Sequence, residues 1–162
     1  MKKIFVLLVA IATMFAQDAL AQQEMTPEQK KAAQKAKREQ LMQIRLELLK
    51  TELNLSDEQL AKFEPVYRKY RHDIQRITNG NKEARTKKEN ITNENALRVM
   101  SARLANNILT STIKQQYLLV FAEVIEPLQV MKLYRVDGKI SREANKIIKE
   151  RANSATANTS TK

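Results

Sequence analysis

The sequence predicts an all-α fold: a long helical hairpin with flanking helices linked to it at two elbows, four to five helices in total. Three observations predict it. Only two glycines and three prolines occur in 162 residues, too few turn residues for a β-rich fold. Apolar residues recur at spacings of three and four through most of the chain. Helix-capping patterns stand where periodic segments meet.

The first helix is expected over residues 27–53. Thr26-Pro27-Glu28-Gln29 is a capping-box pattern with proline at the first helical position. Residues 30–37 are rich in alanine, lysine and glutamine, so this start is expected to be a solvated helix or a mobile arm. An apolar stripe begins only at Leu41 and continues to Leu53.

The first elbow is expected at Leu55-Ser56-Asp57-Glu58-Gln59. Ser56 suits the N-cap, where its hydroxyl accepts a backbone N–H, and the Gln59 side chain can return to the N-cap N–H. Asp57 and Glu58 would then lie in the first turn, where the helix dipole favours negative charge. We interpret these two carboxylates as capping charges and not as a catalytic pair.

The second helix carries the seam of a coiled-coil-like hairpin. Pro65 lies inside it, and the missing N–H and the ring clash, which cost about 3 kcal/mol, predict a kink near residues 61–65. Asn79-Gly80-Asn81 is expected to end it with residues that tolerate the left-handed conformation. Residues 81–92 are expected to form the hairpin loop or a frayed helix start. The seam consists of Leu60, Phe63, Tyr67, Tyr70, Ile74 and Ile77.

The third helix is expected over residues 93–125, about 50 Å long. It carries two apolar stripes, which suggest two partners, one of them the following helix or another subunit. The first stripe is Leu97, Leu104, Ile108, Leu118, Ala122 and Ile125, and the second is Leu109, Ile113, Tyr117, Val120 and Val124.

The second elbow is expected at Ile125-Glu126-Pro127-Leu128-Gln129. Pro127 suits the first helical position and discourages helix at the residue before it. The helix from Pro127 is expected to break at Asp137-Gly138, and a short last helix follows, carried by Ile140, Ile147 and Ile148. Residues 153–162 are expected to be a disordered polar tail.

The first 21 residues have the pattern of a cleaved signal peptide. Lys2 and Lys3 precede an apolar run over residues 4–16, and Ala19-Leu20-Ala21 is an A-x-A cleavage signal. The run is shorter than the roughly 20 residues that span a bilayer. We therefore expect a periplasmic protein with a single helical domain over residues 22–152.

The charge balance is strongly basic. Without Lys2, Lys3 and Asp18, 27 basic and 17 acidic side chains remain, a net charge of +10. Such a field attracts polyanions and acidic protein surfaces. Because export disfavours nucleic acid as a partner, we expect unfolded or acidic client proteins, with contact to an anionic membrane surface as a further partner.

No residue pattern predicts an enzyme, a cofactor or a metal site. Thiol chemistry is absent because the chain has no cysteine, and Gly80 and Gly138 cannot build a phosphate-binding loop. His72 is the only histidine, and its helical neighbours at three and four residues include Arg68, Lys69 and Arg76, which would repel a cation.

A client-binding surface is expected where basic and apolar side chains adjoin. Arg68, Lys69, Arg71 and Arg76 surround two tyrosines of the second helix. The second stripe of the third helix adds Ile113, Tyr117 and Val120. The alternative interpretation places the tyrosines in the hairpin seam and the basic side chains on a solvated face.

The chain resembles the Spy/CpxP family of small periplasmic proteins, which is marked by two L-T-x-x-Q motifs. The first is Leu55-Ser56-Asp57-Glu58-Gln59, with serine for threonine. In the second, Ile125 and Gln129 match, Glu126 replaces the hydroxyl residue, and Pro127 stands where many members have proline. Two further segments also resemble sequences of this family: Phe63-Glu64-Pro65-Val66-Tyr67 and Val130-Met131-Lys132-Leu133-Tyr134. The resemblance therefore covers roughly residues 40–150.

The resemblance implies a helical hairpin protomer in a curved, cradle-like homodimer whose concave face holds unfolding clients without ATP. It therefore implies an ATP-independent periplasmic chaperone. Two alternatives stay open: a regulatory protein that binds an envelope sensor kinase, and a Skp-like chaperone of outer-membrane proteins. A Skp-like chain needs a β-rich trimerising base, for which the sequence shows no alternating strands. The zinc-linked members carry His and Cys ligands that this chain lacks.

Overall fold

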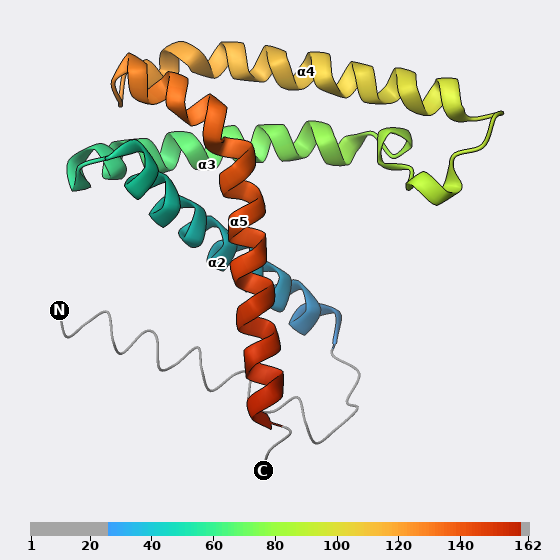
Figure 1. Ribbon diagram of the computed structural model, residues 1–162, viewed down its shortest axis with the longest axis horizontal. Helices are drawn as coiled ribbons and strands as arrows, with labels where there is room; N and C mark the ends of the chain where they lie inside the picture. The colour runs from blue at the N-terminus through green and yellow to red at the C-terminus, as the bar shows by residue number, and fades with distance from the viewer. Residues whose placement is uncertain (1–25, 160–162) are drawn as a thin grey trace. The chain divides into compact units, whose positions relative to one another are not determined.

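Four α-helices make up most of the structure, a computed structural model that describes residues 26–159 and their side chains as far as residue 154. No strand occurs in that range (Figure 1). The all-α prediction is therefore confirmed. The helices are α2 (Pro27–Leu53), α3 (Asp57–Gly80), α4 (Ala96–Ala122) and α5 (Pro127–Thr159), and the short 3-10 helices η1 (Glu83–Arg85) and η2 (Lys88–Asn90) follow α3.

The helices α2 and α3 begin directly after the predicted capping residues Thr26 and Ser56. Thr26 and Gln29 form the expected capping box at the start of α2, with the Gln29 N–H 3.3 Å from Thr26 Oγ1 and the Thr26 N–H 2.9 Å from Gln29 Oε1. The helix α3 continues through Pro65 without a break; the kink stays a prediction. It ends at Gly80, but Asn81 is extended, at φ −95° and ψ 99°, so no left-handed residue ends it.

The segment between α3 and α4 is held by polar side chains. Asn95 accepts the Thr92 N–H at 2.9 Å and donates to the Asn90 carbonyl at 3.0 Å. Arg103 of α4 donates to the carbonyl oxygen of Thr86 at 2.8 Å. These bonds occupy the residues just before Ala96, and α4 is therefore shorter than the expected helix over 93–125.

The helix α5 corrects two predictions. It runs from Pro127 to Thr159 without a break at Gly138, so no separate last helix exists. A glycine inside a helix costs only about 1 kcal/mol, and the buried, bonded side chain of Asp137 fixes the preceding residue. Residues 153–159 are helical where a disordered tail was expected. Residues 160–162 and the predicted signal peptide, 1–21, lie outside the described residues.

The described chain divides into two compact units, and the single domain expected over residues 22–152 stays a prediction. One unit contains residues 26–45 and 139–159, and the other contains residues 46–138. We call them the terminal unit and the central unit. Within residues 26–159, every helix is too short or too polar to cross a membrane.

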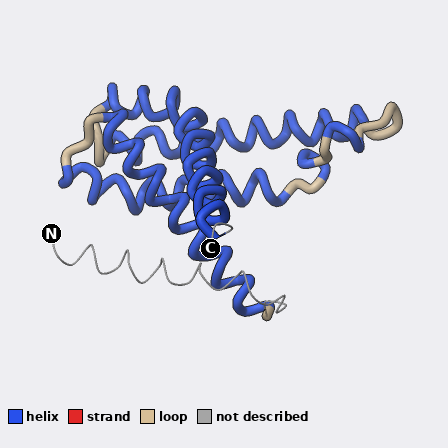
Figure 2. Tube along the Cα trace, turned by 60° about the horizontal axis from the view of Figure 1, so that its bottom comes forward, coloured by secondary structure: helices blue, strands red, loops and turns tan. Residues whose placement is uncertain are grey.

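The central unit is organised around one cluster of aromatic rings. In this unit α3 and α4 lie side by side (Figure 2). Phe63 and Phe121, from α3 and α4, are fully buried, with ring centroids 5.6 Å apart. Tyr70 meets Phe121 edge to face at 5.4 Å, and Tyr134 of α5 joins both rings. Such pairs add stability beyond the area that they bury. The cluster consists of Phe63, Tyr67, Tyr70, Tyr117, Phe121 and Tyr134.

Candidate client-binding surface

The first elbow consists of the C-terminal end of α2 and the N-terminal cap of α3. Ser56 is the N-cap of α3: the Gln59 N–H donates to Ser56 Oγ at 3.1 Å, and the Ser56 N–H donates to Gln59 Oε1 at 3.0 Å. The predicted capping box is therefore confirmed. Leu55, the first residue of the motif, is buried.

The end of α2 contributes a residue that the sequence interpretation missed. Asn54 is left-handed at φ 52°, its N–H donates to the Thr51 carbonyl, and the Leu55 N–H donates to the Lys50 carbonyl at 2.9 Å. These bonds form a Schellman motif with asparagine in the left-handed position. The rule that asparagine follows a helix end could have identified it from sequence.

The two carboxylates after Ser56 have cation partners. Asp57 forms an ion pair with Lys50, and Glu58 accepts from Lys62 at 2.8 Å. The hydrogen bond from Lys50 lowers the pKa of Asp57, and that from Lys62 lowers the pKa of Glu58. Both carboxyls are thus held as anions at the start of α3, which fits the capping interpretation.

The second elbow, like the first, has a glutamine whose side chain accepts the N–H of the residue three positions earlier. Gln129 lies three residues after Glu126, and its Oε1 accepts the Glu126 N–H at 2.9 Å. Pro127 is the first residue of α5, where no N–H is needed. Ile125 is buried, and its N–H donates to the Phe121 carbonyl. The glutamine half of a capping box is therefore present.

The structure brings the two motifs into direct contact. Gln59 Nε2 donates to Gln129 Oε1 at 3.3 Å, and Gln129 Nε2 donates to the Leu53 carbonyl at 3.0 Å. The second bond occupies a carbonyl at the end of α2, one of those that a helix end leaves without a partner. The motif glutamines therefore join the ends of three helices in the central unit.

Two of the predicted client-binding residues lie inside the protein. Ile113 and Tyr117 are each only 8% exposed, on the side of α4 that faces α3. The Tyr117 hydroxyl donates to Asp73 Oδ2 at 2.8 Å. Burial, with a smaller effect of Asp73, raises the pKa of Tyr117 to about 12, and the hydrogen bond lowers the pKa of Asp73. A client could not reach either residue without separating α3 from α4.

The four predicted arginines and lysines have different surroundings. Arg71 binds Asp137 Oδ2 at 3.0 Å in a nearly buried pair, and the Tyr67 hydroxyl donates to the other oxygen of Asp137 at 2.7 Å. Arg68 is paired with Glu64 at 2.8 Å. Lys69 and Arg76 are exposed. Arg71 therefore anchors α5 to α3, and of the basic candidates only Lys69 and Arg76 are freely accessible.

His72 does not lie in a metal-binding group. Its side chain is exposed, and Nδ1 is 3.4 Å from Asp73 Oδ1. Over residues 26–159 no three His, Cys, Asp or Glu side chains are placed to hold a metal ion together.

A broad apolar surface is exposed on α4 and the first turns of α5. Ile113, Tyr117 and Phe121 face inward, and the large side chains on the opposite side of α4 face outward, with Leu97 84% and Leu119 73% exposed. In the described part of the chain, all large hydrophobic side chains that are at least 39% exposed lie on α4 and the first turns of α5. We call them the outer apolar surface: Leu97, Met100, Leu104, Ile108, Leu109, Leu118, Leu119, Val120, Leu128 and Met131.

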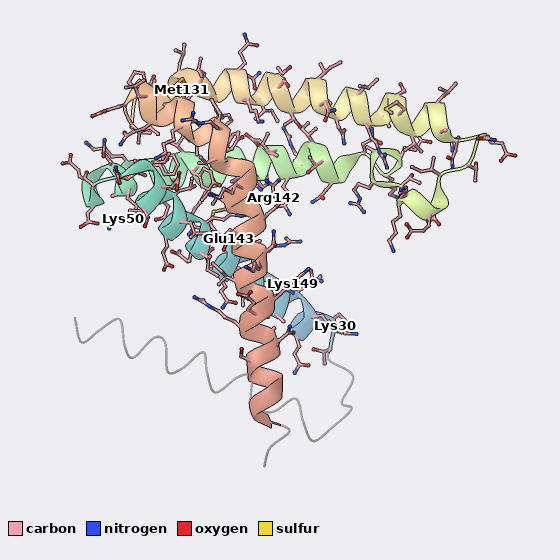
Figure 3. The ribbon with its side chains drawn as sticks, in the orientation of Figure 1. Lys30, Lys50, Met131, Arg142, Glu143 and Lys149 are labelled. Carbon is pink, nitrogen blue, oxygen red and sulfur yellow. The ribbon has the colours of Figure 1, made fainter. Side chains whose placement is uncertain are left out.

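The outer apolar surface includes one predicted residue, Val120, which is 39% exposed. Met131 is marked near the start of α5 in Figure 3. The helix α4 contains no carboxylate, and its cations are Arg98, Arg103 and Lys114. Arg98 pairs with Glu83 outside the helix. The surface is thus apolar with a weakly positive border.

Comparison of the chain with family models, with curated proteins and with solved structures finds no match. The resemblance to the Spy/CpxP family rests on the motif residues quoted above.

Proposed function

We propose that the protein is an ATP-independent periplasmic chaperone that holds unfolded or partly folded proteins on the outer apolar surface. One observation carries the proposal: ten large hydrophobic side chains, 39–84% exposed, are gathered on α4 and the start of α5. Apolar surface of this extent on a soluble protein is typical of an interaction site. The client site thus lies mainly on the side of α4 opposite Ile113, and Leu109 and Val120 of the second stripe form its edge.

The chemistry of this surface suits weak, reversible holding. Burying one exposed leucine side chain gains about 1.5–3 kcal/mol, and association offsets much of that gain through lost freedom of both partners. A client that covers a few of these residues would therefore leave without an energy source. The elbows, closed by hydrogen-bonded caps, keep α3 and α5 in place while the client binds.

Positive charge would assist capture. Lys69 and Arg76 are exposed on α3, and α4 has no carboxylate that would repel an acidic chain. Complementary charge mainly raises the rate of encounter. Suppression of client aggregation is therefore expected to weaken as salt rises, because salt screens exposed charges.

The test is light scattering of an aggregating model client with purified residues 22–162, without nucleotide. Wild type is expected to suppress scattering at equimolar or lower ratios. A triple variant, Leu97→Gln, Leu104→Gln and Ile108→Gln, is expected to lose most of this activity. Its matched control is Ser101→Gln, Ala105→Gln and Asn107→Gln, which adds glutamines to the same turns and removes no large hydrophobic side chain. Equal loss in both variants would contradict the proposed surface.

We also propose that α3 and α4 form the hairpin of a cradle-like homodimer, as the family resemblance implies. Sedimentation equilibrium separates two uses of the outer apolar surface. A dimeric triple variant without chaperone activity would assign the surface to clients, and a monomeric variant would assign it to pairing. No suppression by wild type at several-fold excess would instead favour a regulatory protein that binds one envelope sensor kinase.

A further inference from the structure

Positive charge is concentrated in the terminal unit. Residues 26–45 and 139–159 carry 11 basic and 4 acidic side chains, a net charge of +7, whereas residues 46–138 carry 15 and 12, a net charge of +3. The terminal unit is less than half as long as the central unit. The basic character of the protein thus lies mainly outside the unit that carries the outer apolar surface.

Ion pairing increases this contrast. In the central unit, seven cations lie within 4.0 Å of a carboxylate: Lys50, Lys62, Arg68, Arg71, Lys87, Arg98 and Lys132. In the terminal unit, Lys146 is 3.8 Å from Glu150. Nine other cations there have no carboxylate partner among the described residues: Lys30, Lys31, Lys35, Lys37, Arg38, Lys139, Arg142, Lys149 and Arg151.

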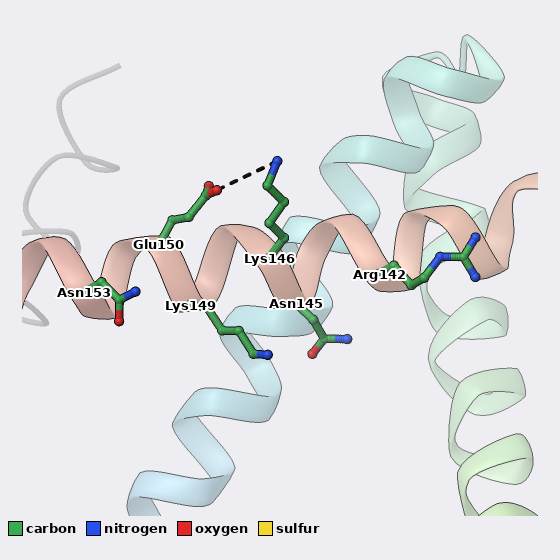
Figure 4. Close-up of a pocket in the computed structure, with 6 residues that line it drawn as sticks. All are labelled: Arg142, Asn145, Lys146, Lys149, Glu150 and Asn153. Carbon is green, nitrogen blue, oxygen red and sulfur yellow. Dashed lines mark ion pairs between the residues drawn. The ribbon is translucent and has the colours of Figure 1, made fainter.

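The cations of α5 form a row. Lys139, Arg142, Lys146 and Lys149 follow one another at spacings of three and four residues, along about 15 Å of helix. The opposite side of this segment carries the buried Ile140. Arg142 and Lys149 project from the same side of α5 in Figure 4, beside Asn145 and Asn153. Lys146 points to the other side of the helix, toward Glu150, in Figure 4, so the open charge of this segment is carried by the exposed Lys139, Arg142 and Lys149.

The first part of α2 is basic and fully accessible. All residues from 27 to 40 are exposed, five of them lysine or arginine. Lys30 lies at the start of this segment and is labelled in Figure 3. The terminal unit exposes no large hydrophobic side chain among its described residues. It therefore lacks the apolar contacts that hold an unfolded chain or anchor a protein interface.

We propose that the terminal unit binds the anionic headgroups of a lipid bilayer surface. The positive charge is spread over two segments and is carried mostly by lysine. Such charge fits an extended anionic surface, because lysine acts as a hydrated point charge and does not need the paired geometry that favours arginine. Neither segment contains an aromatic residue on which a nucleic-acid base could stack. The absence of exposed large hydrophobic residues predicts that the unit lies on the headgroups without entering the hydrocarbon.

The affinity is expected to depend on charge and salt. Each basic side chain close to an anionic membrane changes the partition coefficient by about fivefold. Removing three cations is therefore expected to weaken binding about 100-fold. Raising the salt concentration shortens the range of the interaction and should release the protein.

The experiment is vesicle co-sedimentation of the exported, processed protein, whose N-terminus is checked by mass spectrometry. Vesicles of phosphatidylcholine alone are compared with vesicles that also contain phosphatidylglycerol, at about 50 and about 300 mM salt. The test variant is Lys139→Gln, Arg142→Gln and Lys149→Gln. The control, Lys82→Gln, Lys88→Gln and Arg135→Gln, removes the same number of exposed cations from the central unit. Circular dichroism confirms that both variants are folded.

Wild type and the control are expected to bind only the vesicles with phosphatidylglycerol and only at low salt, and the test variant is expected to lose binding. No binding by wild type, or equal loss in both variants, would overturn the proposal. Tighter binding to a DNA duplex than to the anionic vesicles would overturn it in favour of a nucleic-acid site. Aggregation suppression by the test variant should be unchanged, so this test and the chaperone test fail independently.

Discussion

The side chain of Gln59 donates a hydrogen bond to the side chain of Gln129, with 3.3 Å between Nε2 and Oε1, across 70 residues of chain. Each glutamine also accepts the N–H of the residue just before its own helix, Ser56 or Glu126. The start of α3 and the start of α5 are thus closed by side chains that bind each other. A substitution at one elbow should therefore also weaken the hydrogen bonds at the other elbow.

Gln129→Ala is expected to lower the free energy of unfolding by about 2 kcal/mol. The Leu53 carbonyl and the Glu126 N–H both lose their partner, and the carbonyl bond is only partly exposed. Urea denaturation followed by circular dichroism measures the change. Gln116→Ala, at an exposed position of α4, is the control. A cost no larger than that of the control would show that the contact between the elbows adds nothing to stability.

Ser56→Ala is expected to cost about 1 kcal/mol, because the Gln59 N–H loses its acceptor. Ser56→Thr should keep most of the stability, since threonine also caps helices. Thermal unfolding of the two variants, beside Ser111→Ala within α4, measures the difference. If the alanine and threonine variants were equally stable, the hydroxyl would not be acting as a cap.

Asp137→Asn is expected to destabilise the protein by about 3 kcal/mol, because Arg71 keeps its charge in a nearly buried site without a carboxylate. Arg71→Met in the same chain should recover part of the loss. A double-mutant cycle of unfolding free energies gives the coupling between the two residues. Additive losses would mean that the ion pair does not hold α5 on α3.

Acid is expected to remove the contribution of the bond between Tyr117 and Asp73. The hydrogen bond from Tyr117 lowers the pKa of Asp73 below its ordinary value of 3.8. A lowered folded-state pKa means that this stabilisation is complete above the unfolded-state pKa, about 3.9, and is lost as pH falls through the folded-state value.

The measurement compares unfolding free energies of wild type and Tyr117→Phe at neutral pH and below about pH 3. Tyr117→Phe should cost more at neutral pH than in acid, because only the ionised carboxylate gains from the hydroxyl. Asp57 and Glu58 also titrate in acid but are unchanged by this substitution, so the difference between the two proteins isolates Asp73. A cost independent of pH would exclude the linkage.

The local signals in the sequence predicted the starts of α2, α3 and α5 well. The capping residues Thr26, Ser56 and Pro127 stand where α2, α3 and α5 begin. Capping interactions join residues only a few positions apart, so their geometry follows from the sequence spacing alone. Gly138 was misjudged because a single interior glycine is a weak break, and the long-range bonds of Asp137 were not visible in the sequence.

The faces of α4 could not be assigned from sequence. Both stripes are apolar and both follow the helical period, so periodicity alone does not say which one meets α3. The aromatic contacts of Tyr117 and Phe121 decide it in the structure. Ile113 and Tyr117, which the sequence suggested as client-binding residues, lie on the buried side, whereas Leu97 and Leu104 of the first stripe are exposed. The contact of Gln59 with Gln129 likewise depends on tertiary packing.

The single aromatic cluster has an optical consequence. The chain has no tryptophan, and all its tyrosines belong to that cluster in the central unit. Ultraviolet absorption, tyrosine emission and near-ultraviolet dichroism therefore report on the central unit alone, while far-ultraviolet dichroism reports on every helix. Two melting curves recorded at these wavelengths from one sample would show, without any label, whether the terminal unit unfolds before the rest of the protein.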